Sequence, residues 1–148
     1  MPSASTVFVD TNVLLYAQDP RVPKKQAQAA AWLARCWREN CGRLSTQVLH
    51  ELYANLNRIA PKLDSRDARA LVTRYRAWQP WVVDESTVDL AWHLQDRFAL
   101  SYWDALMVAA AEQLGCKHLL TEDLQHDQRI ESVRIVNPFK LGPELLDA

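Results

Sequence analysis

At positions 6–12 the sequence is Thr-Val-Phe-Val-Asp-Thr-Asn, a short apolar and β-branched run followed at once by polar residues. Such a run is typical of a strand that is buried on both faces. Asp10 stands where this strand ends. A second run of the same kind, His-Leu-Leu-Thr at 118–121, is followed by Glu122 and Asp123. The sequence therefore predicts two buried strands, each with a carboxylate directly after it.

Helical patterns separate these strands. An apolar period of 3.6 residues, with capping residues before it and Pro or Gly after it, marks the helices. We expect helices at about 13–17, 24–38, 46–59, 66–78, 86–98 and 102–114, and further strands at 81–83 and 133–136. Ser86 and Ser101 are the expected caps of the last two helices. Strands alternating with helices predict an α/β protein with a mainly parallel sheet, and residues 1–148 are expected to form one domain.

The composition is that of an ordinary globular chain, with 148 residues, 49% hydrophobic and 24% charged. No apolar run approaches the roughly 18 residues of a membrane span. The N-terminus lacks the pattern of a signal peptide. Cys36, Cys41 and Cys116 do not have the spacing of metal ligands, so we expect free thiols in a cytoplasmic protein without zinc and without a membrane partner.

Charge is distributed unevenly along the chain. Residues 1–76 contain 12 Lys and Arg and 6 Asp and Glu, whereas residues 77–148 contain 5 and 12. This asymmetry is compatible with a basic face beside an acidic pocket, and equally with ordinary solvated helix faces.

Asp104 lies in an unusual setting. It is the only charged side chain between residues 102 and 111, a run that is otherwise apolar on every face of the expected helix. A carboxylate buried there needs a hydrogen bond, an ion pair or a metal ion. Ser101, three residues earlier, also gives nearly the spacing of a capping box. The pattern alone leaves the cap and the functional site equally open.

The topology predicts where three acids meet. In a parallel α/β sheet, the carboxyl ends of the strands and the amino ends of the next helices share one edge. Asp10, Asp104 and Asp123 are all expected at this edge. Carboxylates crowded together repel unless a cation joins them, and hard oxygen ligands suit Mg²⁺ or Mn²⁺. Such a site predicts metal-assisted hydrolysis of phosphate esters or phosphodiesters. Periodicity alone makes Glu51 a solvated residue.

Four blocks of sequence resemble the PIN-domain ribonucleases, specifically the VapC type of toxin. They are Phe-Val-Asp-Thr-Asn-Val-Leu-Leu-Tyr-Ala at 8–17, Thr-Gln-Val-Leu-His-Glu-Leu at 46–52, Ser-Tyr-Trp-Asp-Ala-Leu at 101–106 and Leu-Leu-Thr-Glu-Asp-Leu-Gln-His at 119–126. The resemblance runs from about Val7 to Phe139. It implies a three-layer α/β/α fold with about five strands and Mg²⁺- or Mn²⁺-dependent cleavage of RNA. It also implies a cognate antitoxin that occupies the site, and a homodimer.

The resemblance also implies roles for individual residues. The four acids of the family match Asp10, Glu51, Asp104 and Asp123, of which Asp10, Asp104 and Asp123 are the expected metal ligands. Three polar residues are expected to support these acids by hydrogen bonds: Thr11, Asn12 and Thr121. A metal-activated water is expected to attack phosphorus and to leave 5′-phosphate and 3′-hydroxyl ends.

Some neighbouring residues are open to two interpretations. Relatives often have Gly where this chain has Asp127, and we expect Asp127 to serve a turn rather than the site. Glu122 is expected to be a solvated residue, and His126 is a poorer candidate for a general base than metal-bound hydroxide. Arg21–Lys25 and Arg66–Arg76 are candidate RNA contacts. The tryptophans Trp32, Trp37, Trp78 and Trp81 are candidates for a dimer surface.

Two other functions remain open from the sequence. One is a phosphatase or phosphoacceptor module with an acid cluster, although no Asp-x-Asp follows the first strand and Lys117 precedes its strand. The other is a catalytically silent PIN-like protein that binds RNA or acts as a scaffold.

Overall fold

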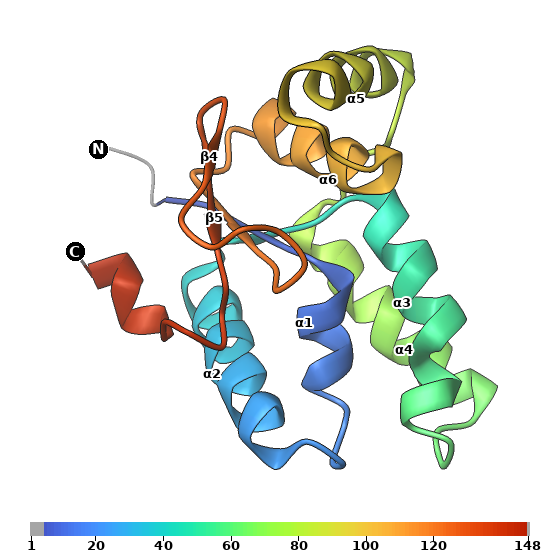
Figure 1. Ribbon diagram of the computed structural model, residues 1–148. Coiled ribbons are helices and arrows are strands. Elements are labelled where there is room, and N and C mark those ends of the chain that lie inside the picture. Colours follow the sequence, from blue (N-terminus) through green and yellow to red (C-terminus); the bar gives the residue numbers. More distant parts are fainter. Residues whose placement is uncertain (1–4, 148) are drawn as a thin grey trace.

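A five-stranded sheet forms the centre of the computed structural model, which describes residues 5–147 (Figure 1). The strand order is β2-β1-β3-β5-β4. The strands are β1 (Val7–Val9), β2 (Gly42–Arg43), β3 (His118–Leu120), β4 (Arg129–Ile130) and β5 (Val133–Val136). The first three and β5 are parallel, and β4 pairs with β5 in the antiparallel sense. The mainly parallel sheet predicted from the sequence is confirmed.

Helices cover both faces of the sheet and give the predicted three-layer α/β/α arrangement. In Figure 1, α5 and α6 lie above the sheet, and α1 and α2 lie below it. The pair α3 and α4 packs beside α1, with α3 in contact with both. The helices are α1 (Thr11–Tyr16), α2 (Pro23–Glu39), α3 (Thr46–Ile59), α4 (Ser65–Arg74), α5 (Glu85–Phe98) and α6 (Tyr102–Gln113), with 3₁₀ turns η1 (Tyr75–Trp78) and η2 (Pro143–Asp147).

Three sequence-based expectations about elements are wrong in detail. Residues 81–83 form no strand; Trp81 makes a single bridge to Ser45, and its backbone bonds to Leu44 and Thr46. The N-cap of α5 is Asp84 rather than Ser86, because the Asp84 carboxylate accepts the N–H of Thr87. The predicted helix at 66–78 becomes a 3₁₀ turn after Arg74. The two-residue strands β2 and β4 are too short to leave an alternating pattern.

The expected tryptophan surface is also wrong for two of its four members. Trp32 and Trp78 are completely or almost completely buried, so neither is available to a second copy of the folded chain. Trp32 donates its indole N–H to the backbone oxygens of Pro138 and Leu141, which ties α2 to the C-terminal segment. The exposed indoles are instead those of Trp92 and Trp103, at 56% and 63% exposure.

Gly42 is required in β2 because the Trp78 ring lies directly against its backbone. A Cβ added at Gly42 would lie 2.6 Å from two ring carbons of Trp78. Neither group can retreat, since both are buried. We therefore expect Gly42→Ala to lower the free energy of unfolding by about 1–3 kcal/mol, the usual cost of overpacking, as measured by denaturant titration.

The control is Gly42→Ala in a protein whose residue 78 carries a smaller ring. In a Trp78→Phe background, Gly42→Ala should cost clearly less, because part of the clash has been removed. An equal cost in the two backgrounds would contradict the assigned contact.

Between residues 5 and 147 there is no helix that is both long and apolar enough to cross a membrane.

Candidate active site

The four predicted acids come from four different elements. Asp10 follows β1 and is the N-cap of α1, and Asp123 follows β3 after two intervening residues. Asp104 lies in the first turn of α6, and Glu51 lies in the second turn of α3. Because β1 and β3 are adjacent and parallel, their carboxyl ends lie side by side. The topology therefore brings the segments after these strands to one edge of the sheet.

Asp10 is the buried centre of this group, with 6% of its surface exposed. One carboxylate oxygen accepts the backbone N–H of Thr11 at 2.6 Å. The other accepts the hydroxyl of Thr121 at 2.8 Å and the side-chain amide of Asn12 at 3.0 Å. Three donors thus fix the carboxylate in one orientation.

Asn12 and Thr121 link the two acids that follow the strands. The Asn12 amide nitrogen donates to Asp123 at 3.0 Å as well as to Asp10. The Thr121 hydroxyl oxygen accepts the backbone N–H of Asp123 at 3.0 Å while it donates to Asp10. These contacts hold the loop after β3 against the start of α1. The Asn12 side-chain oxygen is buried and has no hydrogen-bond partner in the described part of the chain.

Glu51 joins the group through Thr11, so the solvated position suggested by periodicity is wrong. Its side chain is half-buried, and one carboxylate oxygen accepts the Thr11 hydroxyl at 3.0 Å. The other accepts the side-chain amide of Gln47, one turn earlier in α3, at 2.9 Å. Gln47 lies four residues before Glu51, and this spacing is the signal by which it could have been found in the sequence. Gln47 also donates to the backbone oxygen of Trp103 at 3.2 Å.

Asp104 combines the two interpretations that the sequence left open. Its backbone N–H donates to the Ser101 hydroxyl at 3.2 Å, which makes Ser101 the N-cap of α6. The cap uses the backbone of Asp104 and leaves its carboxylate available. The side chain is half-buried rather than buried, because the first turn of α6 lies at the surface and only the helix from Ala105 onward is covered.

Two of the acids, Asp10 and Asp104, have raised pKa values. Burial raises the pKa of Asp10 to about 7; the Thr121 hydrogen bond opposes this rise, and the charges of Asp123 and Glu51 add to it. Burial also raises the pKa of Asp104, again with contributions from Asp123 and Glu51. Asp10 and Asp104 therefore share one electrostatic environment, in which the negative charges of Asp123 and Glu51 add to the effect of burial. No three His, Cys, Asp or Glu side chains within residues 5–147 are close enough to hold a metal ion as they stand.

The nearby charged residues have other partners. Glu122 pairs with Lys25 at 2.7 Å, so it is a part-buried ion-pair residue rather than the expected solvated one. The His126 ring accepts the backbone N–H of Asn137 at 3.0 Å, so this nitrogen is engaged in a backbone contact. Asp127 has a φ of 72° and pairs with Arg134. Gly adopts such a left-handed backbone readily, and this conformation agrees with the turn role expected for Asp127.

The fold and the acids at one edge of the sheet define a class of protein. This is a three-layer α/β/α protein with a cluster of acids at the carboxyl ends of its central strands. The sequence pattern of the PIN domain matches residues 7–130. The chain therefore belongs to the PIN-domain family.

Solved structures share this fold at low sequence identity. A toxin–antitoxin complex from Klebsiella pneumoniae contains a chain with 18% identity and a TM-score of 0.62, covering 90% of this chain and 98% of that one. FitAcB from Neisseria gonorrhoeae has 21% identity and a TM-score of 0.61, with 92% and 100% covered. VapC20 from Mycobacterium tuberculosis, a toxin that cleaves the sarcin-ricin loop, has 21% identity and a TM-score of 0.57, with 77% and 87% covered. No curated protein matches the chain.

Proposed function

We propose that this PIN-domain protein is a divalent-metal-dependent endoribonuclease and the toxin of a toxin–antitoxin pair. The observation that carries the proposal is the hydrogen-bonded arrangement around Asp10, in which Asn12 and Thr121 connect it with Asp123. Family membership supports a nuclease, and the structural neighbours include toxins and toxin–antitoxin complexes. By analogy, the partner would be an antitoxin that covers the acidic site.

The donor atoms at this edge fit Mg²⁺ or Mn²⁺. The candidate ligands Asp10, Asp104 and Asp123 offer carboxylate oxygens, and the partnerless Asn12 oxygen lies beside them. Oxygen donors without thiolate or imidazole favour these hard ions over zinc. Binding an ion would require the exposed Asp123 and the half-buried Asp104 to adjust their side chains, since no such group is preassembled. A bound divalent ion supplies positive charge at the phosphate and lowers the pKa of water.

The protein's own residues would orient the Asp10 carboxylate and favour its charged form. Thr11, Asn12 and Thr121 donate three hydrogen bonds to Asp10, and these favour its charged form against the effect of burial. Glu51, held by Thr11 and Gln47, is placed to accept a proton or to position a water at the same edge. These roles amount to binding and positioning. The expected homodimer remains a prediction.

The test is a gel assay with purified protein and defined single-stranded RNAs in the presence of Mn²⁺, Mg²⁺ or EDTA. We expect cleavage with a divalent ion and none with EDTA. RNA binding without cleavage under any of these conditions would favour the silent PIN-like protein. Hydrolysis of a phosphomonoester without RNA cleavage would favour the phosphatase.

A cavity beside Asn12 offers a place for an RNA phosphate. It has a volume of about 370 Å³, and its lining includes Arg21, Arg58 and Glu122. Arg21 is paired with Asp19, whereas Arg58 is exposed and forms no salt bridge with residues 5–147. We expect Arg58→Gln to weaken RNA binding and to reduce the slope of log K against log salt concentration by about 0.7, the loss of one phosphate contact to a single strand.

The matched control for this prediction is Arg129→Gln, which removes an exposed arginine from β4. Equal salt slopes for the wild-type and Arg58→Gln proteins, measured by fluorescence anisotropy, would exclude Arg58 as a phosphate contact.

A further inference from the structure

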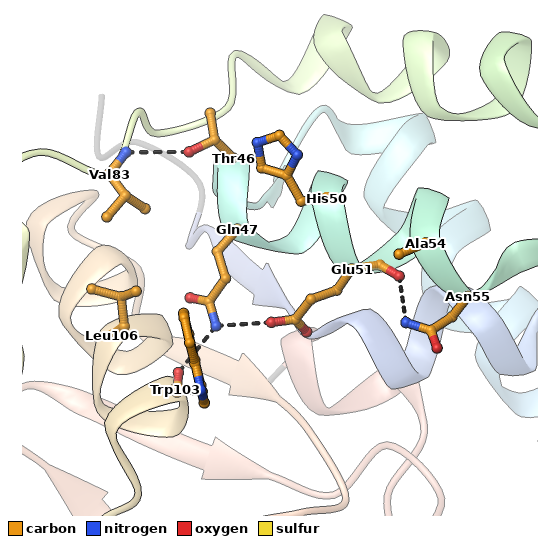
Figure 2. Close-up of a pocket in the computed structure, with 9 residues that line it drawn as sticks. All are labelled: Thr46, Gln47, His50, Glu51, Ala54, Asn55, Val83, Trp103 and Leu106. Atoms are coloured by element: carbon orange, nitrogen blue, oxygen red, sulfur yellow. Dashed lines mark hydrogen bonds between the residues drawn. The ribbon is translucent and has the colours of Figure 1, made fainter.

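A cavity between α3 and α6 adjoins the acidic site. Its volume is about 580 Å³, within the range of small-molecule sites. Figure 2 shows that α3 forms one wall and that Trp103 and Leu106 of α6 form the other. The lining residues are Thr46, Gln47, His50, Glu51, Ala54, Asn55, Val83, Trp103 and Leu106.

Trp103 presents a large aromatic surface to this cavity. The residue is 63% exposed, whereas Trp32 and Trp78 are buried in the core. The indole is supported at one edge by the Tyr102 ring, with ring centroids 5.2 Å apart in a T-shaped arrangement. Its backbone oxygen accepts the Gln47 amide, which joins the start of α6 to α3. An exposed indole held in this way is a flat platform that the fold itself does not use.

The cavity adjoins the acidic site through Glu51. Glu51 lines the cavity, and its carboxylate is bonded to Thr11, which also donates its backbone N–H to Asp10. Trp103 directly precedes Asp104. The single Gln47 amide contacts both Glu51 and Trp103. A group bound in the cavity would therefore lie next to a phosphate held at the acids.

The lining chemistry selects an occupant that is flat and carries no negative charge. Glu51 is the only residue of formal charge in the lining, and no Lys or Arg is present to attract a phosphate. Ala54, Val83 and Leu106 supply apolar walls. Thr46, His50 and Asn55 supply polar groups that can form hydrogen bonds. A nucleobase has both an apolar face for stacking and a polar edge for such groups.

We propose that this cavity is a nucleobase subsite, in which a base next to the cleaved phosphodiester stacks on Trp103. The inference rests on the proposed ribonuclease function and specifies its substrate as unpaired RNA. A base within a duplex has both faces covered by its neighbours and cannot stack on the indole.

The test compares two 12-residue oligoribonucleotides, oligoadenylate and an abasic strand of the same length. Both are bound to full-length protein carrying Asp10→Asn, so that cleavage does not interfere, and affinity is read by fluorescence anisotropy in Mg²⁺. Adding Trp103→Ala should weaken oligoadenylate binding about ten- to a hundredfold, the usual effect of losing one stacked base. Binding of the abasic strand should not change. Trp103→Phe should retain most of the affinity.

Trp92→Ala is the matched control, since Trp92 is 56% exposed but lies on α5, outside the lining of this cavity. The proposal is overturned if Trp103→Ala leaves oligoadenylate binding unchanged, or if it weakens both strands equally. It is also overturned if Trp103→Ala alters only the binding of a protein partner. The result is separable from the proposed function: base-dependent binding without any cleavage by the wild-type protein would refute the nuclease and keep the subsite. Cleavage that is insensitive to Trp103→Ala would keep the nuclease and refute the subsite.

Discussion

Asp10→Asn should reduce RNA cleavage by about a thousandfold or more while the protein remains folded. Asp10 is the buried acid to which Thr11, Asn12 and Thr121 all donate hydrogen bonds. The amide that replaces the carboxylate has no negative charge, so it binds a divalent ion weakly. Losing the charge stabilisation that such an ion provides costs several kcal/mol of barrier height, and each 1.36 kcal/mol is a factor of ten in rate.

The control for this substitution is Asp96→Asn, which removes one negative charge from an exposed position on α5. It should cleave RNA at the wild-type rate. Circular dichroism and thermal unfolding would establish that both variants are folded. Full activity of Asp10→Asn in a preparation free of contaminating nuclease would remove Asp10 from the chemistry.

The stability of the metal-free protein should decrease as pH rises from about 4 to about 7. The ordinary pKa of Asp is 3.8, and burial raises that of folded Asp10 to about 7. Between these values the folded chain keeps a proton that the unfolded chain has lost. The free energy of unfolding then falls with rising pH, with a slope of at most about 1.4 kcal/mol per pH unit for one proton.

Asp10→Asn isolates this effect. Acids with lowered pKa values change the free energy of unfolding in the opposite direction and at lower pH. For example, Arg134 lowers the pKa of Asp127, so the stabilisation from this pair is lost only as the pH falls below the ordinary pKa of Asp, 3.8. The difference between wild-type and Asp10→Asn proteins cancels such contributions. We expect this difference, measured by denaturant titration in EDTA, to change steadily across the window. A constant difference would show that Asp10 titrates normally.

The sequence predicted the parts of the fold that depend on strong local patterns. The apolar runs that form β1, β3 and β5 are buried on both faces, and the 3.6-residue period is clear in α2, α3 and α5. Two-residue strands such as β2 have no period to detect. The stretch near Trp81 is apolar because it packs against the core and bonds to Leu44 and Thr46, which a local pattern does not distinguish from a strand.

In the site, too, some residues could be placed from the sequence, and others depend on contacts between distant segments. Asp10 and Asp123 could be placed from topology alone, because strand ends in a parallel sheet share one edge. Glu51 could not be placed in this way, since its link to the other acids is a hydrogen bond from the Thr11 hydroxyl, 40 residues away in the chain. The hydrogen bond from Gln47 to the backbone oxygen of Trp103 joins α3 to α6, 56 residues apart in the chain, and no single segment encodes that contact.

We propose that RNA is hydrolysed by a water molecule at the acids, with the divalent ion that they would hold, rather than by attack of the 2′-hydroxyl of the RNA. End-group analysis of RNA cleaved by the wild-type protein in Mn²⁺ tests it most directly. We expect 5′-phosphate and 3′-hydroxyl ends. Products with 2′,3′-cyclic phosphates and 5′-hydroxyl ends would contradict the account.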